Sequence, residues 1–385
     1  MGETRKPVTK QEAKRIWIQA QGLNTPAPFG DRTGATRKAI EHLGYVQIDT
    51  INVIERCHHH ILFNRIPTYR REHLMHAQKI EKSVFEYWTH ALAYIPAGDF
   101  RFFMNRMAEY RTNPERWFHR TTPQEIRRVL KTIEKEGAIT IRDMNDEVLV
   151  EKTHPWASKK PSKKALEIAF YAGQVVINER IGMLKRYELT LRHFGWEKMP
   201  KKATENERLN YRLDRALRSQ GLVSLDSVAY LEPSAKPLFE KAIKSRVRKG
   251  ELLEVAIDDV TAKHWAQPEV FEHEVEAPTL THLLSPFDPL VIQRKRLAQF
   301  FDYEHRFEAY LPKEKRKYGY FALPVLMDDE IVALLDLKAD RQKQKLLVQK
   351  WSWLKKFKSP ARKARIEEAL DRFEAFQLQI EGGLG

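Results

Sequence analysis

The sequence predicts an α+β fold in which several helix–glycine–strand units come first and a small β-domain with a terminal helix comes last. At five places a helix-periodic stretch is followed by a glycine and then by a short run that favours a β-strand. The glycines are Gly44, Gly137, Gly173, Gly221 and Gly250, and the pattern is weakest at Gly250. β-rich runs dominate after about Ala277, and the stretch Pro360–Ile380 near the end of the chain is amphipathic.

The glycines have a physical reason to stand where they do. A helix commonly ends with its C′ residue in the left-handed conformation, which costs glycine least. The Thr, Val and Ile residues that follow favour the extended state. A helix, a glycine turn and a strand are what a winged helix needs where its last helix leads into the wing. One copy also fits many α/β proteins, but repeated copies in a basic chain favour tandem winged helices.

We expect four regions along the chain. They are a first winged-helix unit with a helical segment (1–115), a second winged-helix unit (116–200), a third (201–276), and a C-terminal small β-barrel or sheet domain with its closing helix (277–385).

Three local patterns refine the first two regions. The aromatic segment Phe85–Ala91 has helical spacing and is expected to lie in a packed helix. Thr122 and Pro123 suit the N-cap and the first position of a helix. The segment Lys159–Lys164 is basic and interrupted by a proline, which predicts a loop.

The last region predicts a hairpin and a helix. The runs Lys317–Leu326 and Glu330–Leu337 are β-rich and are joined by Met327-Asp328-Asp329. In the closing helix, Ile366, Leu370, Phe373 and Phe376 fall on one stripe, which indicates packing against the domain.

The segment Gly44–Ile51 contains the candidate catalytic pair. Its apolar residues alternate with Gln47 and Asp49, which stand two apart. In an extended segment the side-chain period is two, so the amide and the carboxylate would emerge on one face while their neighbours anchor the other in a core. The alternative is a half-buried strand with a polar outer face.

The charge of the chain indicates a polyanionic partner. Lys and Arg number 67 against 52 Asp and Glu, a formal net charge of +15. The simplest such partner is nucleic acid, and the alternative is a basic but merely solvated surface. Residues expected to contact DNA are Arg56, His59, His60, Lys163, Lys164, Lys185 and Arg186.

Other chemistries find little support. Three consecutive histidines, His58 to His60, suggest a metal, but adjacent side chains diverge on a helix or a strand, so phosphate contact or core packing is favoured. GxxxxGK[ST], GxGxxG, GxSxG and HExxH are absent. The single Cys57 excludes an intrachain disulfide and a CxxC zinc site, and favours a reducing cytosol. No apolar run is long enough to cross a membrane.

Several segments together resemble the AlkZ/YcaQ family of winged-helix DNA glycosylases, from about Val8 to Val348. The matching segments are Val46–Asn52, Glu86–Ala91, Gly173–Arg180, Leu284–Leu290 with Arg294–Arg296, and Lys315–Leu326 with Asp336–Lys338. Within that family a Gln-x-Gln motif marks antibiotic self-resistance enzymes and Gln-x-Asp marks the YcaQ type, which Gln47 and Asp49 match. The run His58–His60 departs from YcaQ, and no role is carried onto it.

The resemblance implies a C-shaped arrangement of tandem winged helices with a C-terminal β-domain. It also implies a monofunctional DNA glycosylase that releases N7-alkylated purines and unhooks interstrand crosslinks. We therefore expect as partner double-stranded DNA with alkylated or crosslinked bases, with no cofactor and no metal. A monomer in the cytoplasm, associated with the nucleoid through DNA, is also expected.

The residues are compatible with that chemistry. Glycoside hydrolysis usually needs two carboxyls, because the leaving group must be protonated, and the motif offers one. A guanine alkylated at N7 is already cationic and leaves without a proton. Asp49 would then stabilise the oxocarbenium-like sugar and activate water, and Gln47 would position that water. The alternative is a non-catalytic winged-helix transcriptional regulator, since fold alone does not decide function.

Overall fold

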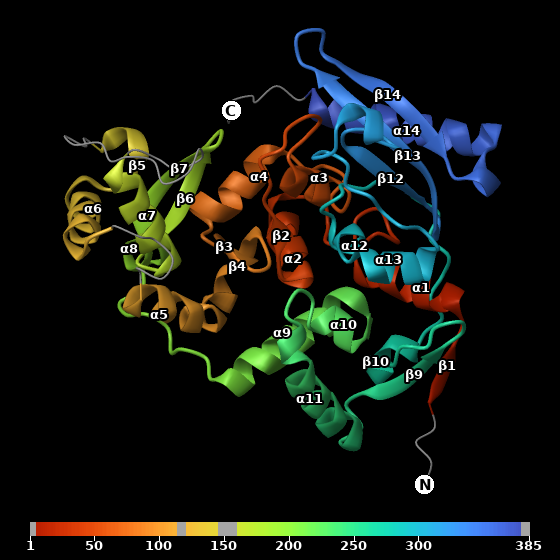
Figure 1. The fold of residues 1–385 in the computed structure, drawn as a ribbon, viewed down its shortest axis with the longest axis horizontal. Helices are drawn as coiled ribbons and strands as arrows, with labels where there is room; N and C mark the ends of the chain where they lie inside the picture. The colour runs from red at the N-terminus through yellow and green to blue at the C-terminus, as the bar shows by residue number, and fades with distance from the viewer. Residues whose placement is uncertain (1–4, 114–120, 145–159, 379–385) are drawn as a thin grey trace. The chain divides into compact units, whose positions relative to one another are not determined.

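The computed structural model describes residues 5–113, 121–144 and 160–378, which form two compact units (Figure 1). The first unit combines Met1–Arg71 with Leu209–Gly385, and the second is Glu72–Arg208. The two units do not test the division into four regions, which stays a prediction. Within the described residues, no helix is both long and apolar enough to cross a bilayer.

The first unit contains two sheets and most of the helices. Its helices, including one that begins just before residue 209, are α1 (Lys10–Ala20), α2 (Thr33–Leu43), α3 (Cys57–Phe63), α9 (Glu205–Gln220), α10 (Leu225–Val228), α11 (Lys236–Arg248), α12 (Pro289–Ile292), α13 (Arg294–Phe301) and α14 (Pro360–Gln377). Its strands are β1 (Lys6–Val8), β2 (Val46–Gln47), β8 (Leu222–Val223), β9 (Leu253–Ile257), β10 (His264–Ala266), β11 (Thr281–Leu283), β12 (Ala322–Met327), β13 (Glu330–Asp340) and β14 (Lys345–Trp353). Short 3₁₀ turns are η5 (Pro233–Ala235), η6 (Pro268–Phe271), η7 (Lys313–Lys315) and η8 (Lys355–Phe357).

The second unit is a smaller mixture of helices and hairpins. Its helices are α4 (Arg71–Met75), the π-helical η1 (His76–Ile80), the 3₁₀ turns η2 (Ala97–Phe102) and η4 (Ile141–Asp143), α5 (Met104–Thr112), α6 (Pro123–Glu136), α7 (Pro161–Tyr171) and α8 (Thr190–Phe194). Its strands are β3 (Val84–Trp88), β4 (Leu92–Pro96), β5 (Ile139–Thr140), β6 (Val175–Ile181) and β7 (Leu184–Leu189).

All five predicted glycine turns are confirmed. Each glycine follows a helix at positive φ and precedes a strand: Gly44 (φ 75°), Gly137 (86°), Gly173 (68°), Gly221 (66°) and Gly250 (74°). At Gly44 there is also no room for a side chain, because a Cβ there would lie 2.3 Å from side-chain carbons of Arg215. The glycine therefore lets α2 turn into β2 while α9 packs against the turn.

A similar order of elements occurs in both units, with the short helix α10 added in the first. In the first, α9, β8, α10 and α11 are followed by the β9–β10 hairpin, in a sheet of order β1-β9-β10-β8. In the second, α6, β5 and α7 are followed by the β6–β7 hairpin, in a sheet of order β5-β7-β6. Thr122 caps α6 with a capping box to Glu125, and Pro123 is at its first position, as predicted.

The C-terminal region forms an open antiparallel sheet of order β11-β12-β13-β14. The predicted hairpin is confirmed, because β12 and β13 pair and Asp328 adopts a left-handed φ of 56° between them. Of the two predicted forms, a sheet or a barrel, the described strands make the sheet. The helix α14 contacts β11 and β14, and it lies beside β14 in Figure 1. Its buried side chains include Ile366, Phe373 and Phe376.

Two predictions of local structure are wrong. Phe85–Ala91 is not helical: Phe85 to Trp88 belong to β3, because short aromatic runs also favour strands and periodicity alone does not separate the two. The loop predicted at Lys159–Lys164 is helical from Pro161 onward, since proline is well tolerated at the first position of a helix. Lys159 lies outside the described residues.

Candidate functional site

The strand that carries the candidate pair is shorter than predicted. β2 contains Val46 and Gln47, whose side chain is buried, whereas the half-buried Asp49 lies two residues beyond the strand. Asp49 Oδ1 accepts the backbone N–H of Ile51 at 2.8 Å. This bond from a side chain to the backbone two residues on favours a turn over a continued strand. The strand therefore includes Gln47 but not Asp49, so the alternation of side chains along a strand does not fix the face on which Asp49 emerges.

Cys57 connects the motif to α3. Its Sγ donates a hydrogen bond to the backbone oxygen of Gln47 at 3.0 Å. Burial, and then the nearby charge of Asp49, raises the pKa of this thiol well above its ordinary value. The thiol is therefore protonated at neutral pH and acts as a buried donor that holds the first turn of α3 against β2.

The end of β13 and the turn after it hold the segment that follows the motif. The backbone N–H of Ala339 donates to the carbonyl of Val53 at 3.0 Å. One terminal nitrogen of Arg341 donates to both the backbone oxygen and Oδ1 of Asn52, each at 3.0 Å. The segment between Asp49 and α3 is thereby fixed by residues almost 290 positions away in the chain, and no local signal in the sequence predicts this contact.

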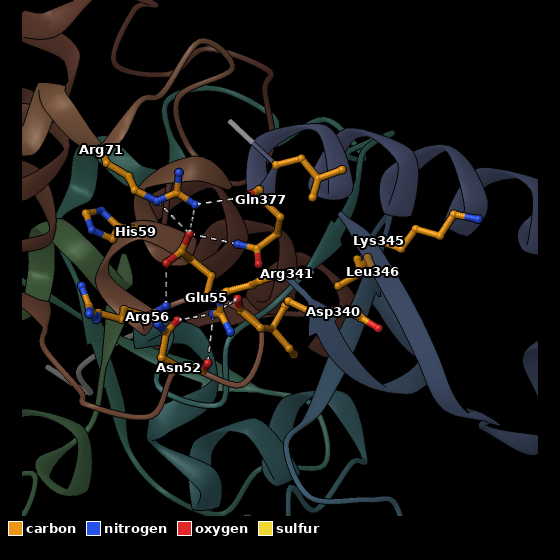
Figure 2. Close-up of a pocket in the computed structure, with 13 residues that line it drawn as sticks. Asn52, Glu55, Arg56, His59, Arg71, Asp340, Arg341, Lys345, Leu346 and Gln377 are labelled. Atoms are coloured by element: carbon orange, nitrogen blue, oxygen red, sulfur yellow. Dashed lines mark hydrogen bonds and ion pairs between the residues drawn. The ribbon is translucent and has the colours of Figure 1, made fainter. Parts of the chain in front are cut away.

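A pocket of about 210 Å³ opens beside this clamp, and we call it the Glu55 pocket (Figure 2). Its lining comes from the segment before α3, from α3, from the first residue of α4, from the β13–β14 hairpin and from the end of α14. It includes Asn52, Glu55, Arg56, His59, Arg71, Asp340, Arg341, Lys345 and Gln377. Arg341, Lys345 and Gln377 were missed by sequence reasoning, because only the tertiary structure brings them to the motif.

The carboxylate of Glu55 is the buried centre of this pocket, with the residue 6% exposed. It accepts hydrogen bonds from Arg71 Nε at 3.1 Å, from Gln377 Nε2 at 2.9 Å and from the backbone N–H of Arg56 at 2.8 Å. Burial acts to raise the pKa of Glu55, but the neighbouring His59 and Arg71 hold it below its ordinary value. Glu55 is therefore a charged group that is already satisfied.

The side chains of the histidine run, His58 to His60, are mostly buried. His60 is 1% exposed, its Nε2 lies 2.6 Å from the carbonyl oxygen of Leu283, and its ring stacks on Phe373. Burial lowers the pKa values of His59 and His60 to about 4, so both are neutral near pH 7. The burial of His60 favours the core-packing alternative over phosphate contact. His59 is half-buried, lines the Glu55 pocket and bonds the hydroxyl of Tyr69 at 2.7 Å.

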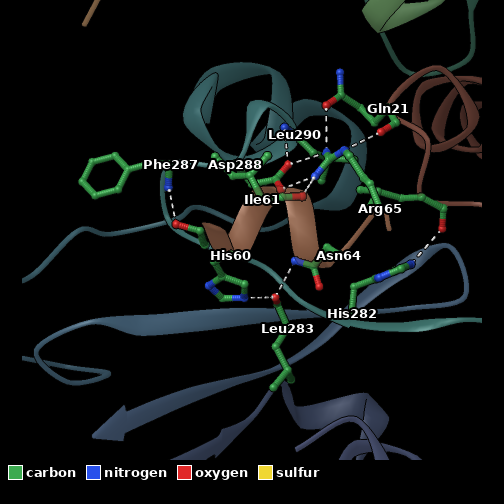
Figure 3. A network of polar contacts seen from close by, with 12 residues as sticks. Gln21, His60, Ile61, Asn64, Arg65, His282, Leu283, Phe287, Asp288 and Leu290 are labelled. Carbon is green, nitrogen blue, oxygen red and sulfur yellow. Dashed lines mark hydrogen bonds and ion pairs between the residues drawn. The ribbon is translucent and has the colours of Figure 1, made fainter. Parts of the chain in front are cut away.

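A buried ion pair anchors the far end of α3 (Figure 3). The guanidinium of Arg65 binds both carboxylate oxygens of Asp288, at 2.8 and 3.0 Å, and both side chains are fully buried. Arg65 also donates to the backbone oxygens of Gln21 and Ile61. The carbonyl of Leu283, which bonds His60, also accepts from Asn64. This network fixes α3, and with it one wall of the Glu55 pocket.

The remaining predicted DNA contacts lie in the second unit. Lys163 is exposed and Lys164 half-buried, both in the first turn of α7. The ammonium of Lys185 lies 5.4 Å from the ring centre of Phe170, and burial lowers its pKa. Arg186 bonds the carbonyl of Ala138 and forms an ion pair with Glu179 at 3.0 Å.

A second, larger hollow of about 880 Å³ lies between α10, α11 and the β9–β10 hairpin, and we call it the α11 groove. Three of its lysines pair with carboxylates: Lys236 with Asp226, Lys244 with Glu240, and Lys263 with Glu254. Two further cations of the groove, Lys241 and Arg248, are exposed and form no ion pair within the described residues.

No metal site emerges from the part of the chain that the structure describes, where no three His, Cys, Asp or Glu side chains are grouped to hold an ion.

Comparison with known proteins gives two findings. The model of a protein family described as DNA glycosylase AlkZ-like matches residues 40–376, which include Gln47, Asp49 and most of the Glu55 pocket. Among solved structures, the fold is similar to that of the Streptomyces sahachiroi DNA glycosylase AlkZ, with a TM-score of 0.64. The two share 16% sequence identity over 96% of this chain and 97% of that chain, so this likeness concerns the fold.

Proposed function

The chain belongs to the AlkZ-like family of DNA glycosylases, and on this premise we propose that it releases N7-alkylated purines from double-stranded DNA by hydrolysis of the N-glycosidic bond. The proposal includes the unhooking of interstrand crosslinks. A crosslinked base is tethered to the opposite strand and cannot be flipped freely into a deep pocket. It therefore needs a site that is open to the duplex.

The proposed chemistry requires only one carboxylate. A purine alkylated at N7 carries a positive charge, so it departs without a general acid. The step breaks the bond between C1′ and the base nitrogen, and the electron pair leaves with the base. Asp49 then stabilises the cationic sugar and accepts a proton from the attacking water, while the amide of Gln47 orients that water.

One observation carries the assignment to Asp49. Its carboxylate is half-buried and, among the described residues, forms no ion pair with a lysine or an arginine, while Oδ1 accepts the backbone N–H of Ile51. A carboxylate that no neighbouring cation neutralises keeps its charge for the developing positive charge on the sugar.

The two repeated orders of helices and hairpins support the proposal that the chain uses winged helices to hold DNA. Both have a helix, a short strand, a further helix and a hairpin whose last strand pairs with the first strand. We propose as phosphate contacts Arg56, His59, Lys163, Lys164, Lys185 and Arg186. His60 is left out because its imidazole is buried.

The test is incubation of the protein with a duplex that contains N7-methylguanine, followed by assays for free base and for abasic sites. We expect base release and abasic sites without strand breaks until alkali is added, as for a monofunctional enzyme. Asp49→Asn should bind the duplex as the wild type does and lose at least about 10²-fold in single-turnover rate. A regulator would bind the DNA and leave it chemically unchanged, and full activity of Asp49→Asn would remove Asp49 from the mechanism.

A further inference from the structure

We propose that the Glu55 pocket binds one backbone phosphate of the strand that carries the damaged nucleotide, with Arg56 and Arg341 as its cationic contacts. The inference rests on the proposed function, since it takes DNA as the substrate. It adds Arg341 to the nucleic-acid interface and assigns a single phosphate to a defined place next to the motif.

The charges of the pocket favour an anion. Four lining residues are cationic and two are carboxylates, and the neutral His59 adds no charge. Glu55 is already engaged by Arg71 and Gln377. Asp340 accepts the backbone N–H of Lys343 at 3.1 Å. Within the described residues, Arg56, Arg341 and Lys345 form no ion pair with any carboxylate, so the pocket has an excess of positive charge.

Arg56 supplies a second, independent observation. Its Nε is buried and has no hydrogen-bond partner within the described residues. A buried donor without an acceptor is costly, and native proteins rarely retain one without a reason. A phosphate suits such a donor, because the fork of N–H groups of a guanidinium matches two phosphate oxygens at once.

The size and position of the pocket narrow the ligand to one charged group. Pockets that enclose whole small molecules usually measure about 300–1,000 Å³, so a hollow of about 210 Å³ is suited to a phosphate with its waters. Arg56 directly precedes Cys57, whose thiol bonds the backbone of Gln47. Arg341 is tied to Asn52, three residues after Asp49. A phosphate held here would therefore set the register of the strand against the candidate catalytic pair.

The experiment combines protein variants with single neutral phosphates in the DNA. Duplexes with N7-methylguanine carry one methylphosphonate at successive positions on either side of the lesion. Binding is measured with Asp49→Asn as the parent, so that turnover does not interfere. We expect one position at which the neutral linkage weakens binding by about tenfold, the effect of one charge-assisted hydrogen bond. In the Asp49→Asn/Arg56→Gln variant the same linkage should weaken binding by less than it does in the parent, because the contact from Arg56 is already lost.

Salt dependence and a matched control complete the design. Arg56→Gln should reduce the slope of log affinity against log salt by about 0.9, as expected for the loss of one phosphate contact. Lys343→Gln removes a charge from the same turn outside the pocket lining and should not show the coupling to the methylphosphonate. Thermal unfolding of each variant checks that the fold is intact, and Arg341→Gln, at an exposed position, serves if Arg56→Gln fails to fold.

The outcomes separate the two proposals. If every methylphosphonate reduced the affinity of the parent and of the Arg56→Gln variant equally, the phosphate site would be overturned, even if the wild type released base. If the effect of Arg56→Gln depended on one methylphosphonate position but the wild type released no base, the phosphate site would be supported and the glycosylase proposal overturned. Binding of a free acidic peptide to the pocket, with no coupling to any DNA phosphate, would also overturn it.

Discussion

The Glu55 pocket and the α11 groove are both rich in positive charge, but they hold that charge differently. In the pocket, cations surround a buried carboxylate that three donors fix, and a turn from β13 clamps the neighbouring segment. In the groove, lysines on flexible stems pair with carboxylates at the surface. Surface pairs contribute little and adapt readily, whereas a buried pair demands one geometry. From this difference we expect the pocket to position a ligand and the groove to add affinity.

The largest effect should come from the network beneath the pocket. Arg65→Met leaves Asp288 buried without its partner, so we expect a loss of about 3–5 kcal/mol in the free energy of unfolding. Chemical denaturation measures it. Arg65→Met/Asp288→Asn removes the charge from both partners and should recover part of the loss. A change below 1 kcal/mol in the single variant would show that the pair does not anchor α3.

The second largest effect should come from acid, which should lower the free energy of unfolding through His59 and His60. The pKa values of His59 and His60 are depressed to about 4 by burial, against about 6.5 in an unfolded chain. The unfolded state therefore binds more protons below pH 6.5, so stability should fall as pH decreases from 6.5 towards 4. At pH 5, each such histidine should lower the free energy of unfolding by about 1–2 kcal/mol. Denaturation at several pH values measures the slope.

A pair of substitutions tests the contribution of His60 to that slope. His60→Asn should flatten the dependence of stability on pH between 6.5 and 4, because one depressed imidazole is gone. His273→Asn replaces an exposed histidine and serves as the control. Identical slopes in both variants would mean that the imidazole of His60 is not held neutral by its surroundings.

The smallest effect should come from the groove. Lys241→Gln/Arg248→Gln removes its two cations without an ion pair, and we expect affinity for duplex DNA to fall about tenfold while the single-turnover rate at saturation is unchanged. The salt slope should fall by up to about 1.8, or 0.9 for each lost contact. Fluorescence anisotropy across salt concentrations measures both quantities.

Lys358→Gln/Lys363→Gln removes the same charge from exposed positions on and beside α14 and is the matched control for the groove. An equal loss of affinity in this control would mean that the groove acts only through net charge. A fall in the rate at saturation in the groove variant would show that the groove also positions the substrate, against the comparison drawn above.

Local signals explain which parts of the fold were predictable. The glycine turns, the capped start of α6, the β12–β13 hairpin and the stripe of α14 each depend on a few neighbouring residues. The segment Phe85–Ala91 was misread because a short aromatic run suits helix and strand alike. The strand ends at Gln47, and two residues later the side chain of Asp49 accepts the backbone N–H of Ile51, which favours a turn.

The sequence by itself determined the family, the α+β class and the basic character, because these depend on composition, periodicity and motifs that are contiguous in the chain. Only the tertiary structure decided that Arg341, Lys345 and Gln377 join Glu55 and Arg56 around one pocket, and that His60 is buried. These residues are separated by more than 280 positions, and folding brings them together through contacts that no local pattern encodes.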